Sequence, residues 1–157
     1  MREITHSELL SLAHYDPDSG VFTRLADGYV MGKPDRKGYL LTWLKDWRFR
    51  SHRLAWLYMT GAWPTQEIDH INGDTSDNRW TNLRECSHQQ NNHNQPLRRS
   101  NKSGVKGVHL NRRGKWQVQV CLNYKIHHGG SYERLEDAER VARQLRERLH
   151  GEFANHG

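Results

Sequence analysis

The sequence contains few cysteines and a small share of hydrophobic residues. Of its 157 residues only Cys86 and Cys121 are cysteines, 34% are hydrophobic, and the mean hydropathy is -1.01. Two distant cysteines outside any CxxC pair are not typical of a disulfide framework or a zinc ribbon, so no structural zinc is expected. The hydrophobic content is low for a single well-packed core. It favours a small core supported by a metal site, or a fold completed on a polymer.

Long apolar runs are also missing. The first fifteen residues carry charge early, and no stretch suits a signal peptide or a membrane span. We therefore predict a soluble cytoplasmic protein without a membrane partner. The length allows one ordinary domain or two small ones.

One segment lacks acidic residues altogether. Between Glu85 and Glu133 there is no Asp or Glu, in a chain of net charge +6 and pI near 9.5. This distribution predicts a surface that contacts the phosphate backbone of a nucleic acid, although a solvated basic linker is the alternative. Eight basic residues fall in this segment: Arg98, Arg99, Lys102, Lys106, Arg112, Arg113, Lys115 and Lys125.

The first half of the chain alternates between helical and extended patterns. A capped helix is predicted over residues 4–15, a turn over 16–20, and a second helix over 52–60 that ends at Gly61. Short strands are predicted between these helices, at 21–24, 38–44 and 48–51. Most aromatic residues lie in or beside the strands. We expect them to form the core of a small sheet, with stacking on nucleic acid as the alternative.

The last third is predicted to form three strands and a helix. The strands are expected at 105–110, 115–122 and 125–128, with turns at Arg113-Gly114 and Asn123-Tyr124. The middle strand alternates between apolar and polar residues, which predicts one buried face and one face for DNA. Alternation places Trp116 on the buried face. The helix is expected over 133–150, with Ser131 as its cap.

The polar stretch from Glu67 to Asn94 contains residues suited to phosphodiester hydrolysis. Asp69 supplies a hard anionic oxygen of the kind that Mg²⁺ binds. His70 has an ordinary pKa near neutrality and can accept a proton from water. Adjacent side chains of an extended segment diverge, so one can bind a metal ion while the other faces the water.

After these residues we expect a turn over 78–83 that leads into a helix starting at Asn82-Leu83-Arg84. Asn91 and Asn94 lie on one face of any helix formed there, and the Asn91 amide oxygen can complete the metal site. A single Asn is more commonly a cap or turn residue, which is the interpretation given to Asn78.

The segment IDHINGDTSDNRWTNLRECSHQQNNHN resembles the HNH endonuclease motif in the form that ends in Asn. The preceding HRLAWLYMTGAWP resembles the segment that leads into this motif in phage and intron-encoded HNH homing endonucleases. Together they cover residues 52–94. The resemblance implies a ββα-metal fold and phosphodiester hydrolysis in DNA with one divalent metal ion, Mg²⁺ or alternatively Mn²⁺.

The same resemblance implies roles for individual residues. Asp69 and Asn91 correspond to the two metal ligands, with His93 as the alternative to Asn91, and His70 corresponds to the general base. Asn82 corresponds to the residue that hydrogen-bonds the hairpin loop and orients the histidine. The four cysteines of a zinc knuckle, present in other HNH families, are absent here.

Residues 101–154 resemble the Apetala2-type DNA-binding domain, in the S-G-x-x-G-V, G-K-W and L-H-G-E-F pieces. The resemblance implies three antiparallel strands backed by one helix, with the sheet in the major groove of DNA. That family can use a Trp in this region for DNA, which leaves both roles open for Trp116. The residues at the matching strand positions are Lys106, His109, Arg112, Arg113, Lys115, Gln117 and Gln119.

We therefore predict an α+β protein with a small β-rich N-terminal region, a ββα-metal HNH module, and a three-stranded antiparallel sheet backed by one helix. The expected divisions are 1–94 for the nuclease part (core 52–94), 95–103 for a basic linker and 104–157 for the DNA-binding domain. The predicted function is a metal-dependent, homing-type DNA endonuclease that nicks or cuts both strands of double-stranded DNA at a recognised site. It is expected to act as a monomer in the cytoplasm, which is that of the host cell for a phage-encoded protein. The alternatives are a DNA-binding regulator with a non-catalytic HNH-like scaffold and an unspecific nuclease.

Overall fold

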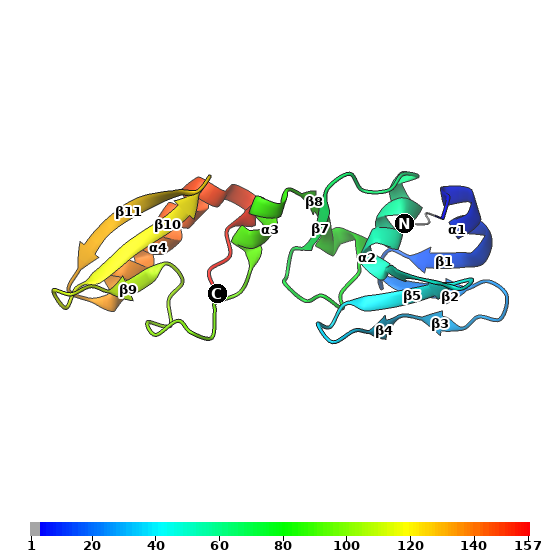
Figure 1. The fold of residues 1–157 in the computed structure, drawn as a ribbon, viewed down its shortest axis with the longest axis horizontal. Coiled ribbons are helices and arrows are strands. Elements are labelled where there is room, and N and C mark those ends of the chain that lie inside the picture. The colour runs from blue at the N-terminus through cyan, green and yellow to red at the C-terminus, as the bar shows by residue number, and fades with distance from the viewer. Residues whose placement is uncertain (1–3) are drawn as a thin grey trace. The chain divides into compact units, whose positions relative to one another are not determined.

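The computed structural model describes residues 4–157 (Figure 1), which form two compact units that divide between Ser87 and His88. Each unit has its own hydrophobic core. The first core gathers residues from the N-terminal helix through the HNH-like segment, and the second lies between a sheet and a long helix. The HNH-like segment, 52–94, therefore crosses the division between the units.

The first unit begins with a short capped helix. Helix α1 (His6–Leu12) follows Thr5, whose hydroxyl accepts from the Glu8 N–H at 3.2 Å while the Glu8 carboxylate accepts from the Thr5 N–H at 3.0 Å. The predicted helix and cap are confirmed, but its predicted end is wrong. Residues 13–16 form strand β1 (Ala13–Asp16) instead, because Ala13 and Tyr15 alternate into the core.

Two small antiparallel sheets follow. Strands β1, β2 (Val21–Arg24) and β3 (Val30–Met31) form one, and β4 (Lys33–Pro34), β5 (Leu40–Leu44) and β6 (Trp47–Arg50) form the other. The strands predicted at 21–24, 38–44 and 48–51 are confirmed, with shifts at the ends of the last two. The two-residue strands β3 and β4 are too short to leave a periodic pattern in the sequence.

The prediction that the aromatic residues form a sheet core is correct only in part. Tyr15 and Phe22 are buried, with ring centroids 4.8 Å apart. Trp43 and Trp47 remain 51% and 47% exposed. Trp43 points away from the core because it alternates with the buried Thr42 in β5.

Helix α2 (Ser51–Thr60) and a two-stranded sheet complete the first unit. The helix ends at Gly61 in the left-handed conformation, as predicted, with φ 79°. Strand β7 (Glu67–His70) pairs antiparallel with β8 (Leu83–Cys86). The predicted helix start at Asn82-Leu83-Arg84 is wrong: only residues 80–82 form a 3-10 turn, and Leu83 pairs with His70 in the sheet.

The second unit starts with helix α3 (His88–Asn94) and contains a sheet of order β11-β10-β9. The sheet strands are β9 (Val108–Leu110), β10 (Trp116–Leu122) and β11 (Lys125–Tyr132), and helix α4 (Leu135–His150) lies along one face (Figure 1). A 3-10 turn, Gly151–Phe153, follows α4. Among residues 4–157, no helix is long and apolar enough to cross a membrane.

Three details of the second unit bear on the sequence predictions. Asn123 and Tyr124 form the β10–β11 turn with φ of 52° and 60°, as expected for a tight hairpin. Trp116 is partly buried and packs against the core under α4, so its position is that of a core residue. The predicted cap Ser131 is wrong, since β11 extends through Tyr132 and Arg134 precedes the helix.

Candidate active site

His70 is the last residue of β7 and lies almost fully inside the first unit. It is 4% exposed, and the neighbouring Asp69 is 5% exposed. Pairing of β7 with β8 fixes the backbone of both residues, with Asp69 opposite Arg84 and His70 opposite Leu83. The two side chains therefore start from a rigid, extended segment at the point where the polar loop 71–82 begins.

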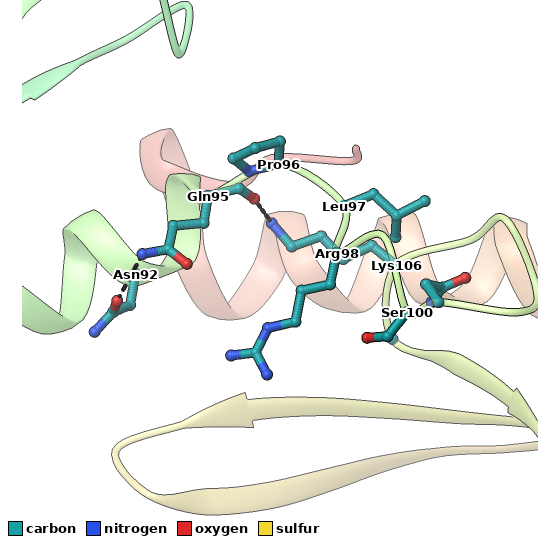
Figure 2. A pocket seen from close by; sticks show the side chains of 9 residues that line it. Asn92, Gln95, Pro96, Leu97, Arg98, Ser100 and Lys106 are labelled. Carbon is teal, nitrogen blue, oxygen red and sulfur yellow. Dashed lines mark hydrogen bonds between the residues drawn. The ribbon is translucent and has the colours of Figure 1, made fainter. Parts of the chain in front are cut away.

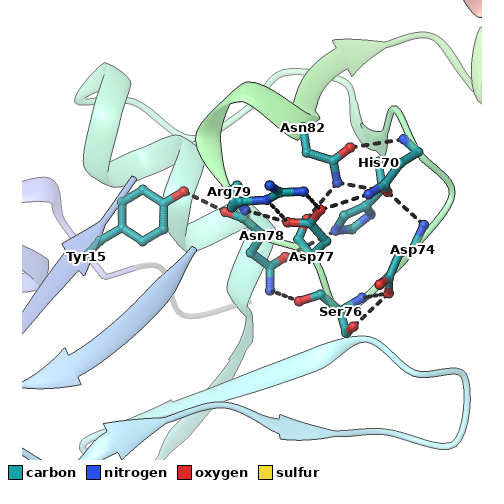
Figure 3. Close-up of polar contacts among 9 residues, drawn as sticks. Tyr15, His70, Asp74, Ser76, Asp77, Asn78, Arg79 and Asn82 are labelled. Carbon is teal, nitrogen blue, oxygen red and sulfur yellow. Dashed lines mark hydrogen bonds and ion pairs between the residues drawn. The ribbon is translucent and has the colours of Figure 1, made fainter. Parts of the chain in front are cut away.

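The side chain of Asn78 contacts the imidazole of His70. The Asn78 Oδ1 lies 3.1 Å from His70 Nε2, while the Asn78 amide nitrogen donates to the Ser76 carbonyl at 3.4 Å (Figure 3). An amide oxygen only accepts, so the neutral imidazole carries its proton on Nε2. The lone pair is then on Nδ1. Asn78, predicted only as a turn residue, thus determines the tautomer of His70.

Asn82 makes three hydrogen bonds to the loop that follows His70. Its Oδ1 accepts from the Asn72 N–H at 3.0 Å, and its Nδ2 donates to Asn72 Oδ1 at 3.0 Å and to the Asp77 carbonyl at 2.8 Å. Asn72 in turn donates to the Asp77 carboxylate at 2.8 Å. The hydrogen bonds that Asn82 makes here are to the loop, and the contact to the imidazole comes from Asn78 (Figure 3).

The position of Asn78 depends on the N-terminal hairpin. The Tyr15 hydroxyl donates to the Asn78 carbonyl at 2.6 Å (Figure 3). The Trp80 N–H donates to the Pro17 carbonyl at 2.9 Å. The turn before β2 approaches so closely that a Cβ on Gly20 would lie 2.4 Å from the backbone of Asn78 and Arg79. Residues 63 positions apart in sequence therefore meet to hold the loop in place.

Two further rings surround His70. His52 from α2 meets it edge to face, with centroids 5.1 Å apart, and the Tyr39 centroid lies 5.9 Å away. His52 is 7% exposed, and its Nδ1 has no hydrogen-bond partner in the described part of the chain. These rings restrict the motion of the His70 imidazole.

Burial keeps both histidines neutral at pH 7. It lowers the pKa of His70 below its usual range, against the opposing effects of the Asn78 hydrogen bond and of the carboxylates of Asp69, Asp74 and Asp77. Burial, assisted by the charge of a protonated His70, lowers the pKa of His52 to about 3. A neutral His70 is the form that can accept a proton.

The carboxylate of Asp69 is paired with Arg84. Its Oδ2 accepts from Arg84 Nε at 2.9 Å and from Nη2 at 2.8 Å. Within residues 4–157, no group of three His, Cys, Asp or Glu side chains is placed to hold a metal ion. A Mg²⁺-type ion requires fewer protein ligands, because it keeps several waters, and a carboxylate with an amide oxygen suits it.

The second predicted metal ligand lies in the other unit. Asn91 and its alternative His93 are both on α3, in unit 88–157. The His93 ring is stacked on that of His150, with centroids 3.7 Å apart and an interplanar angle of 4°. The Asn94 side chain and carbonyl both accept from Asn155 Nδ2. Asn91 remains the prediction for the second ligand.

Lys106 has a different environment from the other residues predicted to bind DNA. Its ammonium donates to the carbonyls of His93, at 3.0 Å, and Gln95, beside a hollow of about 330 Å³ formed by residues 92–107 (Figure 2). Burial lowers its pKa to about 8. These two hydrogen bonds connect the C-terminal end of α3 to the segment that contains Lys106.

The remaining predicted DNA contacts lie on the sheet and its first hairpin turn. His109 is opposite Gln117 in the β9–β10 pair, on the face away from the buried Val118, and Gln119 lies on that face because it alternates with the buried Val118 and Val120. Arg112 and Arg113 are exposed in the turn. Lys115 forms an ion pair with Glu133 at 2.7 Å.

Comparisons with known proteins identify the family. Residues 50–93 match the HNH endonuclease family. The chain is 35% identical over 107 residues to "Protein 3.8" of Escherichia phage T7, covering 67% of this chain and 88% of that protein.

A solved structure titled "DNA binding and cleavage by the HNH homing endonuclease I-HmuI" matches at 21% identity and a TM-score of 0.48. That match covers 60% of this chain, which spans 57% of the length of the solved one. On its sequence relationship to the phage protein, the chain belongs to the family of phage T7 protein 3.8, and it carries an HNH endonuclease domain at residues 50–93.

Proposed function

We propose that this protein is a metal-dependent endonuclease that hydrolyses phosphodiester bonds of double-stranded DNA at a recognised site. The observation that carries the proposal is the state of His70: buried, neutral, and held by Asn78 with its lone pair on Nδ1. The match of residues 50–93 to the HNH endonuclease family supports the same conclusion.

In the proposed mechanism, His70 Nδ1 accepts a proton from the attacking water. Asn78 keeps the other proton on Nε2, so the ring need not change tautomer before it acts. The positive charge that then develops on the ring is stabilised by the carboxylates of Asp69, Asp74 and Asp77. Asn82 holds the loop that bears Asp77 and Asn78.

The donor set suits one hard divalent ion, Mg²⁺ or alternatively Mn²⁺. We propose Asp69 as its anionic ligand and Asn91 as its amide ligand. When bound, such an ion neutralises charge on the phosphate and on the leaving oxygen. Arg84, paired with Asp69, keeps this carboxylate in a fixed position.

The sheet of the second unit is proposed to bind the duplex. Its residues lie in a segment of 47 positions, 86–132, without an acidic side chain. The Apetala2-like role predicted for residues 104–157 remains part of this proposal, as do the homing-type role and action as a monomer. The proposed contacts on the sheet and its turn are His109, Arg112, Arg113, Lys115, Gln117 and Gln119.

The direct test is cleavage of supercoiled plasmid by the purified full chain. With Mg²⁺ or Mn²⁺ we expect nicked or linear product, and none after chelation by EDTA. Mapping the cut ends on long DNA would show whether a site is recognised. Binding without turnover in either metal would favour a DNA-binding regulator, and cleavage at random positions would favour an unspecific nuclease.

The surface prediction is tested by replacing Arg112 and Arg113 together with alanine. Each lost phosphate contact is expected to reduce the slope of log K against log salt by about 0.9, so the pair reduces it by roughly 2. Fluorescence anisotropy with a labelled duplex at several salt concentrations measures this slope. Arg140 and Arg143, exposed on α4 and paired with Asp137 and Glu139, provide the matched double alanine control. Equal slopes for the two double variants would refute the predicted surface.

A further inference from the structure

One face of the sheet β4-β5-β6 in the first unit is open to solvent and combines tryptophan with basic residues. In the strand register Trp43 pairs with Arg48, Leu41 pairs with Arg50, and Lys33 pairs with Leu41. Directly paired residues of antiparallel strands point to the same side of a sheet. These five residues therefore share one face, which we call the Trp43 face.

The opposite face of the same sheet is the one that builds the core. Thr42 and Leu44 are 0% and 3% exposed, while Phe49 packs against the hydrophobic cluster. On the Trp43 face, by contrast, Lys33 and Arg48 are exposed and Trp43 is 51% exposed. A tryptophan half open to water between two long basic side chains is not needed for the core.

The charge around this face is strongly positive. Residues 33–50 contain six basic residues and two acidic ones, in a chain whose net charge is +6. One of the acids, Asp35, is already paired with Arg50 at 2.6 Å. Asp35 thereby neutralises Arg50, so Lys33 and Arg48 supply the net positive charge of the Trp43 face. This positive surface lies outside the acid-free segment of the second unit and is independent of it.

The face is also linked to the proposed general base. The Arg50 guanidinium lies over the Tyr39 ring, 4.5 Å from its centroid, and the same ring lies 5.9 Å from that of His70. A polyanion bound on the Trp43 face would therefore lie beside the residues that surround His70. All of these contacts are within the first unit.

We propose that the Trp43 face is a second DNA-binding surface, which contacts the backbone of duplex DNA next to the cleavage position. Lys33 and Arg48 neutralise phosphates, and Trp43 packs against the sugars between them. The inference rests on the proposed endonuclease function and adds to it a specific surface. Charge complementarity with a polyanion selects DNA as the occupant.

The test measures DNA binding in a His70→Ala background, so that the duplex is not cut. Arg48→Ala is expected to reduce the slope of log K against log salt by about 1, because one phosphate contact is lost. Trp43→Leu is expected to weaken binding severalfold without changing the slope, because no charge is removed. Fluorescence anisotropy over a salt series gives both quantities.

A second aromatic and basic pair in the same unit provides matched controls. Tyr29 is 51% exposed, like Trp43, and the Arg24 guanidinium lies 5.2 Å from its ring centroid. Arg24 is paired with Asp27 on the other small sheet. Arg24→Ala and Tyr29→Leu therefore remove the same chemical groups elsewhere, and we expect wild-type affinity and slope.

The outcomes separate this inference from the proposed function. If the wild type cuts DNA but Arg48→Ala and Trp43→Leu behave like their controls, the Trp43 face is refuted while the endonuclease stands. If the wild type binds duplex with the expected variant effects but never cuts, the endonuclease is refuted and the surface stands. Melting curves monitored by circular dichroism identify any misfolded variant, and Arg48→Gln then replaces Arg48→Ala in the same assay.

Discussion

Replacing His70 with alanine is expected to reduce DNA cleavage by a factor of about 10²–10⁴, the usual contribution of a positioned general base. DNA binding should be unchanged, because His70 is 4% exposed and contributes no positive charge when neutral. Initial rates of plasmid nicking, together with anisotropy binding curves, measure the two effects separately. His14→Ala, at an exposed position of β1, is the matched control and should cut at the wild-type rate.

The lowered pKa of His70 predicts how DNA cleavage depends on pH. Burial lowers the pKa of His70, so the proton-accepting form persists below pH 6.5. Cleavage should therefore rise with pH through an apparent pKa below that of an exposed histidine, and be near its maximum at pH 7. Cleavage by the His70→Ala variant at the wild-type rate, or an acid limb well above pH 6.5, would contradict the assignment of His70 as the base.

Gly20→Ala is expected to be among the most damaging single changes in the first unit. At φ +73° a side chain costs roughly 1–2 kcal/mol. The new Cβ would also lie 2.4 Å from the Asn78 and Arg79 backbone, and relieving such overlap costs a further ~1–3 kcal/mol. The shift moves Asn78 away from His70. We therefore expect a loss of both stability and cleavage.

Gly28→Ala separates the cost of the left-handed backbone conformation from the cost of the steric overlap with Asn78 and Arg79. Gly28 has nearly the same backbone conformation, with φ +71°, but a Cβ added to it would have no other atom within 4 Å. The Gly28→Ala variant should therefore lose only the stability that a side chain costs in this left-handed backbone conformation, and it should still cleave DNA. Chemical denaturation and plasmid nicking on both variants make the comparison. Equal effects of the two substitutions would show that the close approach of Gly20 to the loop is unimportant.

Much of the site's local structure follows from short-range sequence patterns. Asp69 and His70 lie in an extended segment as expected, and Asn91 lies on a helix, the case for which its position was argued. The helix predicted from Asn82 failed because Leu83 pairs with His70 across the sheet. Such pairing is a long-range interaction, and the local propensity of Asn-Leu-Arg carries no information about it.

The surroundings of His70 could not be predicted for the same reason. Tyr39, His52 and Asn78 come from three separate elements and meet only when the first unit is folded. Of these, Asn78 lies in a stretch that predicts a turn, and a turn residue can also point its amide inward. His52, on α2, gave no distinguishing signal, because a histidine at a helix start is common on a surface.

The exposure of Trp43 illustrates a different limit. Alternation along β5 predicts that Trp43 and Thr42 face opposite sides, but not which side is buried. Hydrophobicity alone favours burial of the tryptophan. The hydroxyl of Thr42, bonded to that of Ser51 at 2.8 Å inside the unit, occupies the core side instead.

The contact between the Tyr15–Gly20 turn and the Asn78–Trp80 loop has a consequence for how this nuclease can be divided. The HNH match begins at residue 50, yet the Tyr15 hydroxyl holds Asn78 and the Pro17 carbonyl holds Trp80 in the same loop. A recombination event that transferred only the matched segment would leave His70 without its support. The smallest piece that can be inherited or transplanted with an ordered His70 therefore includes the N-terminal hairpin, and the two stretches are expected to evolve together.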